Sequence, residues 1–199
     1  HKIAFNILNL VRLKLCLACA GYCKFVIREY ALYANQRKQF GIPIAKFHAI
    51  KEKLALMAAR TFAVESMGYR TTGAIDAIVA TIDKKAADGP NRVVKAIEEF
   101  AVEASILKVA GSEALGYCAD EGVQIHGGYG FIAEYAVERV YRDCRVNRIF
   151  EGTNEINRML IPGTILKRAM KGQFDLMGAM AKIAEEAKDP AKLPGVGSG

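Results

Sequence analysis

The sequence predicts an all-α protein, an up-down antiparallel helical bundle, and three observations favour this class. Apolar residues recur at three- and four-residue spacing over long segments, as they do on the buried side of a helix. Strand-like alternation of apolar and polar residues is hard to find. The connections between the long segments are short, which is typical of antiparallel neighbours. With 199 residues, the chain is long enough to bury a substantial core.

The expected helices are separated by turns that contain glycine, proline or asparagine. In chain order they cover residues 3–34, 44–69 with a continuation to 87, 92–123, 134–143, 153–169 and 174–187. The first two breaks are marked by Gly41 with Pro43 and by the turn 88–91. We assign residues 1–170 to the bundle and residues 171–199 to a helical and flexible tail.

The net charge of +7 is spread along the chain. Lys and Arg occur singly or in pairs, often near Asp or Glu, and no basic block with interleaved aromatic residues stands out. A nucleic-acid site needs a concentrated basic patch, so we expect no nucleic-acid partner. A diffuse positive surface suits acidic ligands such as the phosphates of coenzyme A.

We expect no membrane span and no secretion. The nearest candidate for a span, residues 13–27, is interrupted by Lys14 and Lys24 and is expected to be a core helix. A signal peptide would combine a basic start, an apolar stretch and a small-residue cleavage site, and we find no such pattern.

Five cysteines raise the question of a metal site. Cys16, Cys19 and Cys23 share the first expected helix, while Cys118 and Cys144 stand alone. A metal interpretation of Cys16 and Cys19 lacks a second pair at zinc-like spacing. Buried, reduced thiols in a reducing compartment are the favoured interpretation, and we expect no metal.

The first unusual loop is Arg37–Gly41, between the first two helices. An Arg beside the polar Gln39 and the aromatic Phe40 could bind a phosphate and pack a ring system. The alternative is a polar inter-helix loop closed by glycine, and the segment alone favours that alternative.

The second loop follows Gln124 and contains Gly127 and Gly128. Paired glycines let a backbone approach a ligand and expose its N–H groups, and a long amide beside them is suited to a heterocycle. The spacing is not that of the dinucleotide-binding fingerprint, and a helix C-cap is the alternative. We expect His126 to be structural rather than catalytic.

The third loop contains Glu151 and Gly152, before Thr153 as the expected N-cap of the next helix. Apolar neighbours could desolvate the Glu151 carboxylate, as a general base requires. The alternative, an acidic residue that complements the helix dipole, fits Glu155 better because Glu155 lies within the helix start.

Together, the three loops resemble the C-terminal domain of acyl-CoA dehydrogenases. Residues 37–41 resemble the family's R-x-x-F-G motif, residues 124–131 its Q-x-x-G-G-x-G-F motif, and residues 141–153 its R-D…E-G-T signature. The resemblance extends to about Arg168. The Ile-Pro-Gly-Thr segment 161–164 is most similar to the large, very-long-chain-like members.

The resemblance implies FAD-dependent α,β-dehydrogenation of a fatty acyl-CoA to the trans-2-enoyl-CoA. Glu151 matches the base that removes the α-proton. Some branches place their base on the first helix instead, at the position of Val11, which is not acidic here. Arg12 and Gly152 match positions near the substrate.

The resemblance also implies the cofactor contacts. The matching residues are Arg37, Gln39, Phe40, Gln124, Gly127, Gly128, Thr153 and Glu155. Family members often have Gln or Asn in place of Glu155.

In this family FAD sites are shared between subunits, so a homodimer or homotetramer is implied, with an electron-transfer flavoprotein as electron acceptor. The resemblance leaves bacterial cytoplasm and mitochondrial matrix open. The family's N-terminal and middle domains are absent from this chain, which we therefore expect to be inactive alone. The alternative is a non-catalytic helical binding or assembly module that retains the fold.

Overall fold

The computed structural model describes residues 2–188 and confirms the all-α bundle. Its elements are α1 (Lys2–Gln36), β1 (Lys38–Gln39), β2 (Ile42–Pro43), η1 (Ile44–Lys46), α2 (His48–Ala80), α3 (Gly89–Glu99), α4 (Ala101–His126), η2 (Gly127–Gly130), α5 (Ala136–Cys144), η3 (Arg145–Arg148), α6 (Asn154–Met170) and α7 (Leu176–Glu186). The flexible end expected of the tail falls partly on residues 189–199, which lie outside the described residues.

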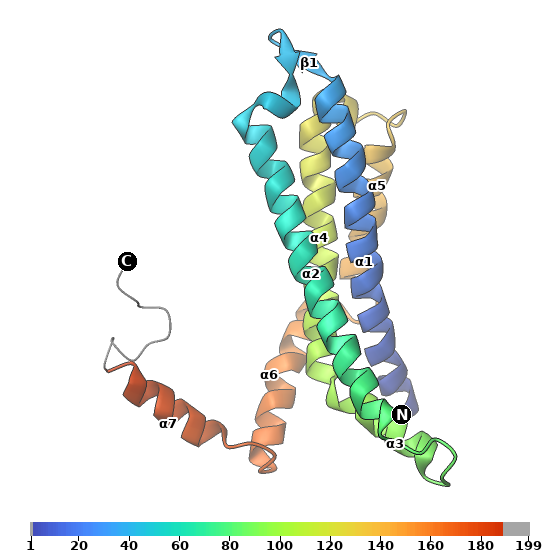
Figure 1. The fold of residues 1–199 in the computed structure, drawn as a ribbon, viewed down its shortest axis with the longest axis vertical. Helices are drawn as coiled ribbons and strands as arrows, with labels where there is room; N and C mark the ends of the chain where they lie inside the picture. The colour runs from blue at the N-terminus through green and yellow to red at the C-terminus, as the bar shows by residue number, and fades with distance from the viewer. Residues whose placement is uncertain (1, 189–199) are drawn as a thin grey trace. The chain divides into compact units, whose positions relative to one another are not determined.

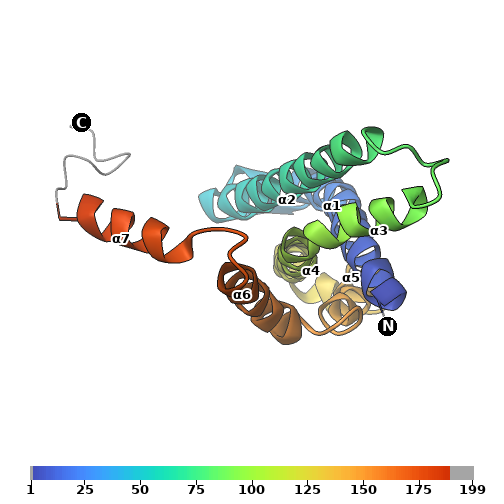
Figure 2. The ribbon, with the colours of Figure 1, turned by 90° about the horizontal axis from the view of Figure 1, so that it is seen from below.

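Helix α4 is the centre of the bundle. Helices α1, α2 and α5 all pack against it, and the two views of the ribbon show α1, α2 and α4 running side by side (Figures 1 and 2). A helix that is covered from several directions must be apolar around most of its circumference. This explains why α4 buries residues on nearly every turn, from Val102 to Ile125.

Small residues let α1 approach α4 closely. A Cβ added at Gly111 would lie 2.8 Å from the Cα of Cys16, and one at Gly122 would collide with the ring of Tyr30. Larger residues at either glycine would push the two helices apart, at the cost of the dispersion contacts of the core.

The five cysteines belong to this core. All are buried and none forms a disulfide, as the thiol interpretation predicted. Burial raises the pKa of Cys16 and Cys19 to about 12. Because a thiolate is the reactive form, these thiols are chemically inert at neutral pH.

Two predicted helices have different bounds in the structure. The single helix expected over 92–123 is wrong: α3 and α4 are separated at Phe100, whose N–H bonds to the Ile97 carbonyl three residues back rather than four. The second helix begins at His48, after the short η1, and ends at Ala80 rather than 87. The apolar spacing continues across such breaks, so periodicity does not locate them.

The loop between α1 and α2 contains a small antiparallel hairpin that the sequence did not predict. Lys38 pairs with Pro43 and Gln39 pairs with Ile42. Strands of two residues are too short to show alternation. The turn between them has Phe40 at φ 53° and Gly41 at φ 83°, both in the left-handed region.

The chain divides into two compact units, His1–Leu160 and Ile161–Gly199. Every candidate site residue lies in the first unit. The second contains the end of α6 and α7, whose N-cap residue Asp175 accepts a hydrogen bond from the Gly178 N–H. Within residues 2–188, every helix is too short or too polar to cross a membrane.

Candidate active site

The loop from Glu151 to Thr153 has an unusual backbone. Glu151 has φ 59° and Gly152 has φ 82°, so two successive residues adopt the left-handed conformation. Glycine does so freely, but a residue with a side chain loses about 1–2 kcal/mol. Glu151 therefore keeps this conformation only because its surroundings hold it there.

Three buried side chains hold the carbonyls of this loop. Arg12 Nε donates to the Glu151 carbonyl at 3.1 Å, and Lys108 Nζ donates to the Gly152 carbonyl at 2.8 Å. Asn157 Nδ2 donates to the carbonyls of Gly152, at 2.8 Å, and Thr153, at 3.0 Å. These bonds go to the backbone and leave the Glu151 carboxylate available.

We call Arg12, Lys108, Asn154 and Asn157 the anchor cluster. Arg12 is 5% exposed, Lys108 and Asn157 are 0% exposed, and Asn154 is buried as well. Lys108 Nζ also donates to Asn154 Oδ1 at 2.7 Å. Asn157 Oδ1 is buried without a hydrogen-bond partner, whereas the amide nitrogen of the same side chain donates to the loop. The hydrogen bonds that the cluster donates restrict the backbone of the loop.

Further polar residues surround the anchor cluster. Arg12 NH1 lies 3.4 Å from Asn9 Oδ1 and 3.5 Å from Ser105 Oγ, both buried acceptors. Asn154 Nδ2 donates to Ser112 Oγ at 3.0 Å and to Glu113 Oε1 at 3.2 Å. The cluster thus joins α1, α4 and the start of α6 through side chains that packing alone would not require.

The anchor cluster brings positive charge to the loop. Burial lowers the pKa of Arg12, and the nearby Glu151 carboxylate partly opposes that change. Burial also lowers the pKa of Lys108, and the charge of Arg12 lowers it further. The positively charged side chains of Arg12 and Lys108 therefore lie close to each other beside the loop that carries Glu151.

Thr153 and Glu155 form the start of α6 as expected. Thr153 Oγ1 accepts a hydrogen bond from the Ile156 N–H at 3.3 Å, which confirms it as an N-cap. Glu155 is exposed, and its own backbone N–H and the Thr153 hydroxyl lower its pKa. Val11, the first-helix position considered as an alternative site for a base, is partly buried on α1.

The other predicted residues gather at the hairpin end of the bundle, opposite the N-terminus in Figure 1. A cavity of about 430 Å³ is lined there by Arg37, Gln39, Gln124, Gly127 and Gly128, among others. Two loops more than eighty residues apart in sequence thus line one cavity. Phe40 is not part of its lining; it lies at the hairpin turn with 93% of its surface exposed.

Aromatic residues shape this cavity. The ring of His126 stacks on Tyr33 at 3.8 Å between centroids, and the Arg37 guanidinium lies 5.3 Å from the centre of the Tyr129 ring. His126 Nδ1 lies 2.8 Å from the Gly122 carbonyl, and burial lowers the pKa of the ring. These contacts agree with a structural role for His126.

Gly127 ends α4 with φ 60° and ψ −136°. This combination is open almost only to glycine, because any Cβ would collide with the backbone. The turn exposes Gly127 and Gly128 beside Gln124, so their backbone can approach a ligand.

The two groups of residues are far apart. Arg12, beside Glu151, lies near the start of α1, and Arg37 follows the last residue of the same helix. At about 1.5 Å of rise per residue, their Cα atoms are roughly 37 Å apart. The structure therefore assembles the predicted residues into two sites rather than one.

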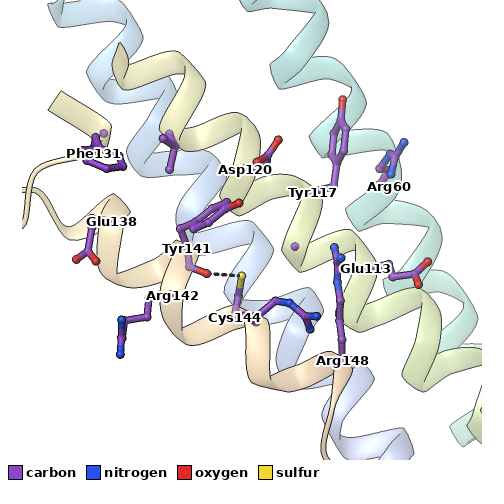
Figure 3. Close-up of a pocket in the computed structure, with 14 residues that line it drawn as sticks. Arg60, Glu113, Tyr117, Asp120, Phe131, Glu138, Tyr141, Arg142, Cys144 and Arg148 are labelled. Carbon is purple, nitrogen blue, oxygen red and sulfur yellow. Dashed lines mark hydrogen bonds between the residues drawn. The ribbon is translucent and has the colours of Figure 1, made fainter. Parts of the chain in front are cut away.

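A third feature is a groove of about 960 Å³ beside α4 (Figure 3). The Arg60 guanidinium lies 3.8 Å from the centre of the Tyr117 ring, and Arg148 packs against Gly116, where any side chain would collide with it. Glu113 connects the groove to the anchor cluster through its bond with Asn154. Glu151 lines neither this groove nor the hairpin-end cavity.

Sequence reasoning missed Lys108, Asn154 and Asn157. Lys108 was detectable: it lies four residues after Ala104 and three before Gly111, both on the expected inner face of the helix. A lysine within an apolar face needs a buried partner. Asn154 and Asn157 gave no signal, since asparagine near a helix start is common.

The chain is similar in sequence to known proteins. Residues 2–166 match the family model of the acyl-CoA dehydrogenase C-terminal domain. A probable acyl-CoA dehydrogenase of Bacillus subtilis is 51% identical over 94% of this chain and 31% of its own length. The human mitochondrial very long-chain specific acyl-CoA dehydrogenase is 37% identical over 100% of this chain and 29% of its own length.

The fold is also found in a solved structure. The crystal structure of a Bacillus anthracis acyl-CoA dehydrogenase complexed with FAD has a TM-score of 0.92 and 52% identity, and the match covers 100% of this chain and 34% of that one. The chain therefore spans about a third of the length of the relatives it matches.

Proposed function

Because this chain belongs to the acyl-CoA dehydrogenase family, we propose that it supplies the base and part of the FAD site of a longer dehydrogenase. The substrate is a fatty acyl-CoA and the product is the trans-2-enoyl-CoA. The Glu151 carboxylate takes the proton from Cα while the hydrogen on Cβ leaves as hydride, and a double bond forms between the two carbons. FAD, when bound, accepts that hydride.

The observation that carries this proposal is the fixed backbone of Glu151. A general base works only when it is held within reach of its proton in one orientation. The left-handed conformation of Glu151 and the three anchored carbonyls meet that requirement. The bonds to the loop occupy backbone oxygens and not the carboxylate that would do the chemistry.

Arg12 and Gly152 serve the same loop in this proposal. Arg12 is 5% exposed and its hydrogen bonds point inward, so it acts on the substrate through Glu151. Gly152 lets the chain turn without a Cβ, which would lie 3.2 Å from Asn157 Nδ2 and 3.3 Å from Arg12 NH2. Thr153, which is half-buried, and Glu155, which is exposed, follow at the start of α6, where they would face the cofactor.

The hairpin-end cavity fits the adenosine diphosphate portion of FAD. Arg37 supplies a cation for a phosphate, and the glycine turn offers bare backbone at 127–128. Gln39 and Gln124 supply amides for the polar edge of a ring or sugar. Phe40 offers an apolar ring to the cofactor or to a second chain, since almost all of it is exposed.

The distance between the two sites supports a shared cofactor. Roughly 37 Å of helix between Arg12 and Arg37 is longer than one extended FAD molecule. One FAD would therefore meet Glu151 of one chain and the Arg37 cavity of another. This arrangement requires at least a homodimer, and a homotetramer satisfies it too.

Electrons would leave the reduced cofactor to an electron-transfer flavoprotein, as the resemblance implies. Five buried, unpaired thiols suit a reducing compartment such as bacterial cytoplasm or mitochondrial matrix. The chain alone would lack activity, because Glu151 lines neither the groove beside α4 nor the hairpin-end cavity, and the remaining walls of an acyl-CoA pocket must come from elsewhere.

Activity of the full-length protein tests the proposal. The purified holoenzyme, mixed with saturated acyl-CoA esters of several lengths and a flavoprotein or dye acceptor, should form 2-enoyl-CoA. A folded, FAD-loaded protein that oxidises none of these esters would favour the non-catalytic alternative.

A further inference from the structure

We infer that Lys108 is a positioning residue for the base: its buried ammonium fixes the Glu151–Thr153 loop without touching the substrate. This inference rests on the proposed function and extends it to a residue of α4 that no motif contains.

The burial of Lys108 is the first step of the argument. The side chain is completely buried, and its two hydrogen-bond acceptors, the Gly152 carbonyl and Asn154 Oδ1, are both neutral. A buried cation without a carboxylate partner is costly, whereas methionine or leucine would fill the same volume without that cost. Packing alone therefore does not explain a lysine at this position.

The choice of acceptors is the second step. Both belong to the segment that follows Glu151 directly, 44 and 46 residues away from Lys108 in the sequence. A lysine that served only the core would satisfy acceptors on the helices around it. Instead, its ammonium ties the carbonyl after the base to the first residue of α6.

The backbone of the base is the third step. Glu151 has φ 59°, a conformation that it would leave without outside bonds. Arg12 holds the Glu151 carbonyl, but the next carbonyl depends on Lys108 and Asn157 together. Removal of the ammonium breaks one of the two bonds to the Gly152 carbonyl and leaves Asn154 Oδ1 with only the Ser112 hydroxyl, so the loop can rotate and move the carboxylate.

The test uses the full-length, FAD-loaded enzyme with Lys108→Met, which keeps the length and loses the donor. We expect kcat to fall about 100-fold, the loss typical of a catalytic group displaced by about 1 Å, while KM changes less than about twofold. The kinetic isotope effect with α-deuterated acyl-CoA should rise, since proton removal becomes slower relative to other steps. Lys108→Gln, which retains an amide donor, should recover part of the rate.

Lys24→Met is the matched control. Its ammonium pairs with Glu65 at 2.7 Å on the exposed surface between α1 and α2, and its loss should leave kcat and the isotope effect unchanged. An unchanged kcat in a folded Lys108→Met holoenzyme overturns the inference. So does a rise of KM alone, or loss of folding or of FAD in both Lys108 variants, which would assign Lys108 to the core.

These outcomes separate the inference from the proposed function. If the wild-type enzyme does not oxidise acyl-CoA, the proposed function is wrong. If the wild type and Lys108→Met are both fully active, only the role of Lys108 is wrong.

Discussion

The Glu151 loop and the Arg37 end of the bundle differ in how their geometry is held. At the Glu151 loop, successive carbonyls are bound by the buried side chains of Arg12, Lys108 and Asn157. At the Arg37 end, the shape comes from turns and from the partly buried, stacked rings of Tyr33 and His126, and Phe40 is almost fully exposed.

This difference indicates that the two regions of the chain have different tasks. The group that would move a proton is fixed in advance by a buried polar network, as preorganised catalysis requires. The residues that would hold a nucleotide are left open, because a ligand and a second chain can complete their contacts on assembly. Changes at the Glu151 loop should therefore lower kcat, whereas changes at the Arg37 end should lower the affinity for FAD.

Among the changes that compare the two ends of the bundle, Gly152→Ala in the holoenzyme should have the largest effect. At φ 82° the new Cβ is strained, and it would lie 3.2 Å from Asn157 Nδ2 and 3.3 Å from Arg12 NH2. The loop must shift, so we expect kcat to fall about 100-fold with FAD content unchanged. Gly163→Ala, at a helical glycine with open space around its Cβ position, is the control. An alanine variant at 152 with normal kcat would show that the loop is not rigid.

Arg37→Met should have a smaller effect, on the affinity for FAD rather than on kcat. Loss of one charged hydrogen bond to a phosphate costs about 1.5–3 kcal/mol, or roughly 10- to 100-fold in FAD affinity. At saturating FAD, kcat should be unchanged, because Glu151 is undisturbed. Titration of the apoenzyme with FAD measures the affinity. Arg28→Met, which removes only an exposed pair with Glu29, should bind FAD like the wild type. A fall of kcat without a change of affinity would erase the distinction between the two ends.

The smallest effect is expected in the pH dependence of stability. Burial lowers the pKa of His126, so the folded state holds its proton less tightly than the unfolded state. The stability that neutral His126 contributes is present above its unfolded-state pKa, about 6.5, and is lost as the pH falls below it toward the lowered folded-state pKa. His126→Phe keeps a ring against Tyr33 and takes no proton. Melting temperatures should be measured between pH 8 and pH 5. The decrease of the melting temperature over this range should be smaller by a few degrees in His126→Phe than in the wild type. An equal decrease would mean that His126 titrates alike in both states.

The sequence predicted the helices well because burial of one face leaves a spacing of three and four residues. It failed at Phe100, where the same spacing continues through a break, and at the hairpin 38–43, where two-residue strands carry no pattern. The N-cap role of Thr153 was predictable because it depends on local chemistry alone.

The candidate sites divide in the same way. Gln39 and Gly128 were assigned to the cofactor through the family resemblance, because the loop 37–41 alone favoured a polar inter-helix loop. Both residues line the same cavity. The anchors of the Glu151 loop could not be predicted from the sequence, since the bond from Lys108 to Gly152 joins residues that only the packing of α4 brings together. The left-handed backbone of Glu151 was invisible for the same reason: nothing in the residue type requires it.

The central claim, that Glu151 removes the α-proton, is tested most directly by anaerobic mixing of the holoenzyme with saturated acyl-CoA while flavin absorbance is recorded. In Glu151→Gln the flavin should bind as in the wild type, and its reduction should slow by about 10²- to 10⁴-fold, the contribution typical of a general base. Reduction at the wild-type rate in a folded, FAD-loaded Glu151→Gln enzyme would contradict the account.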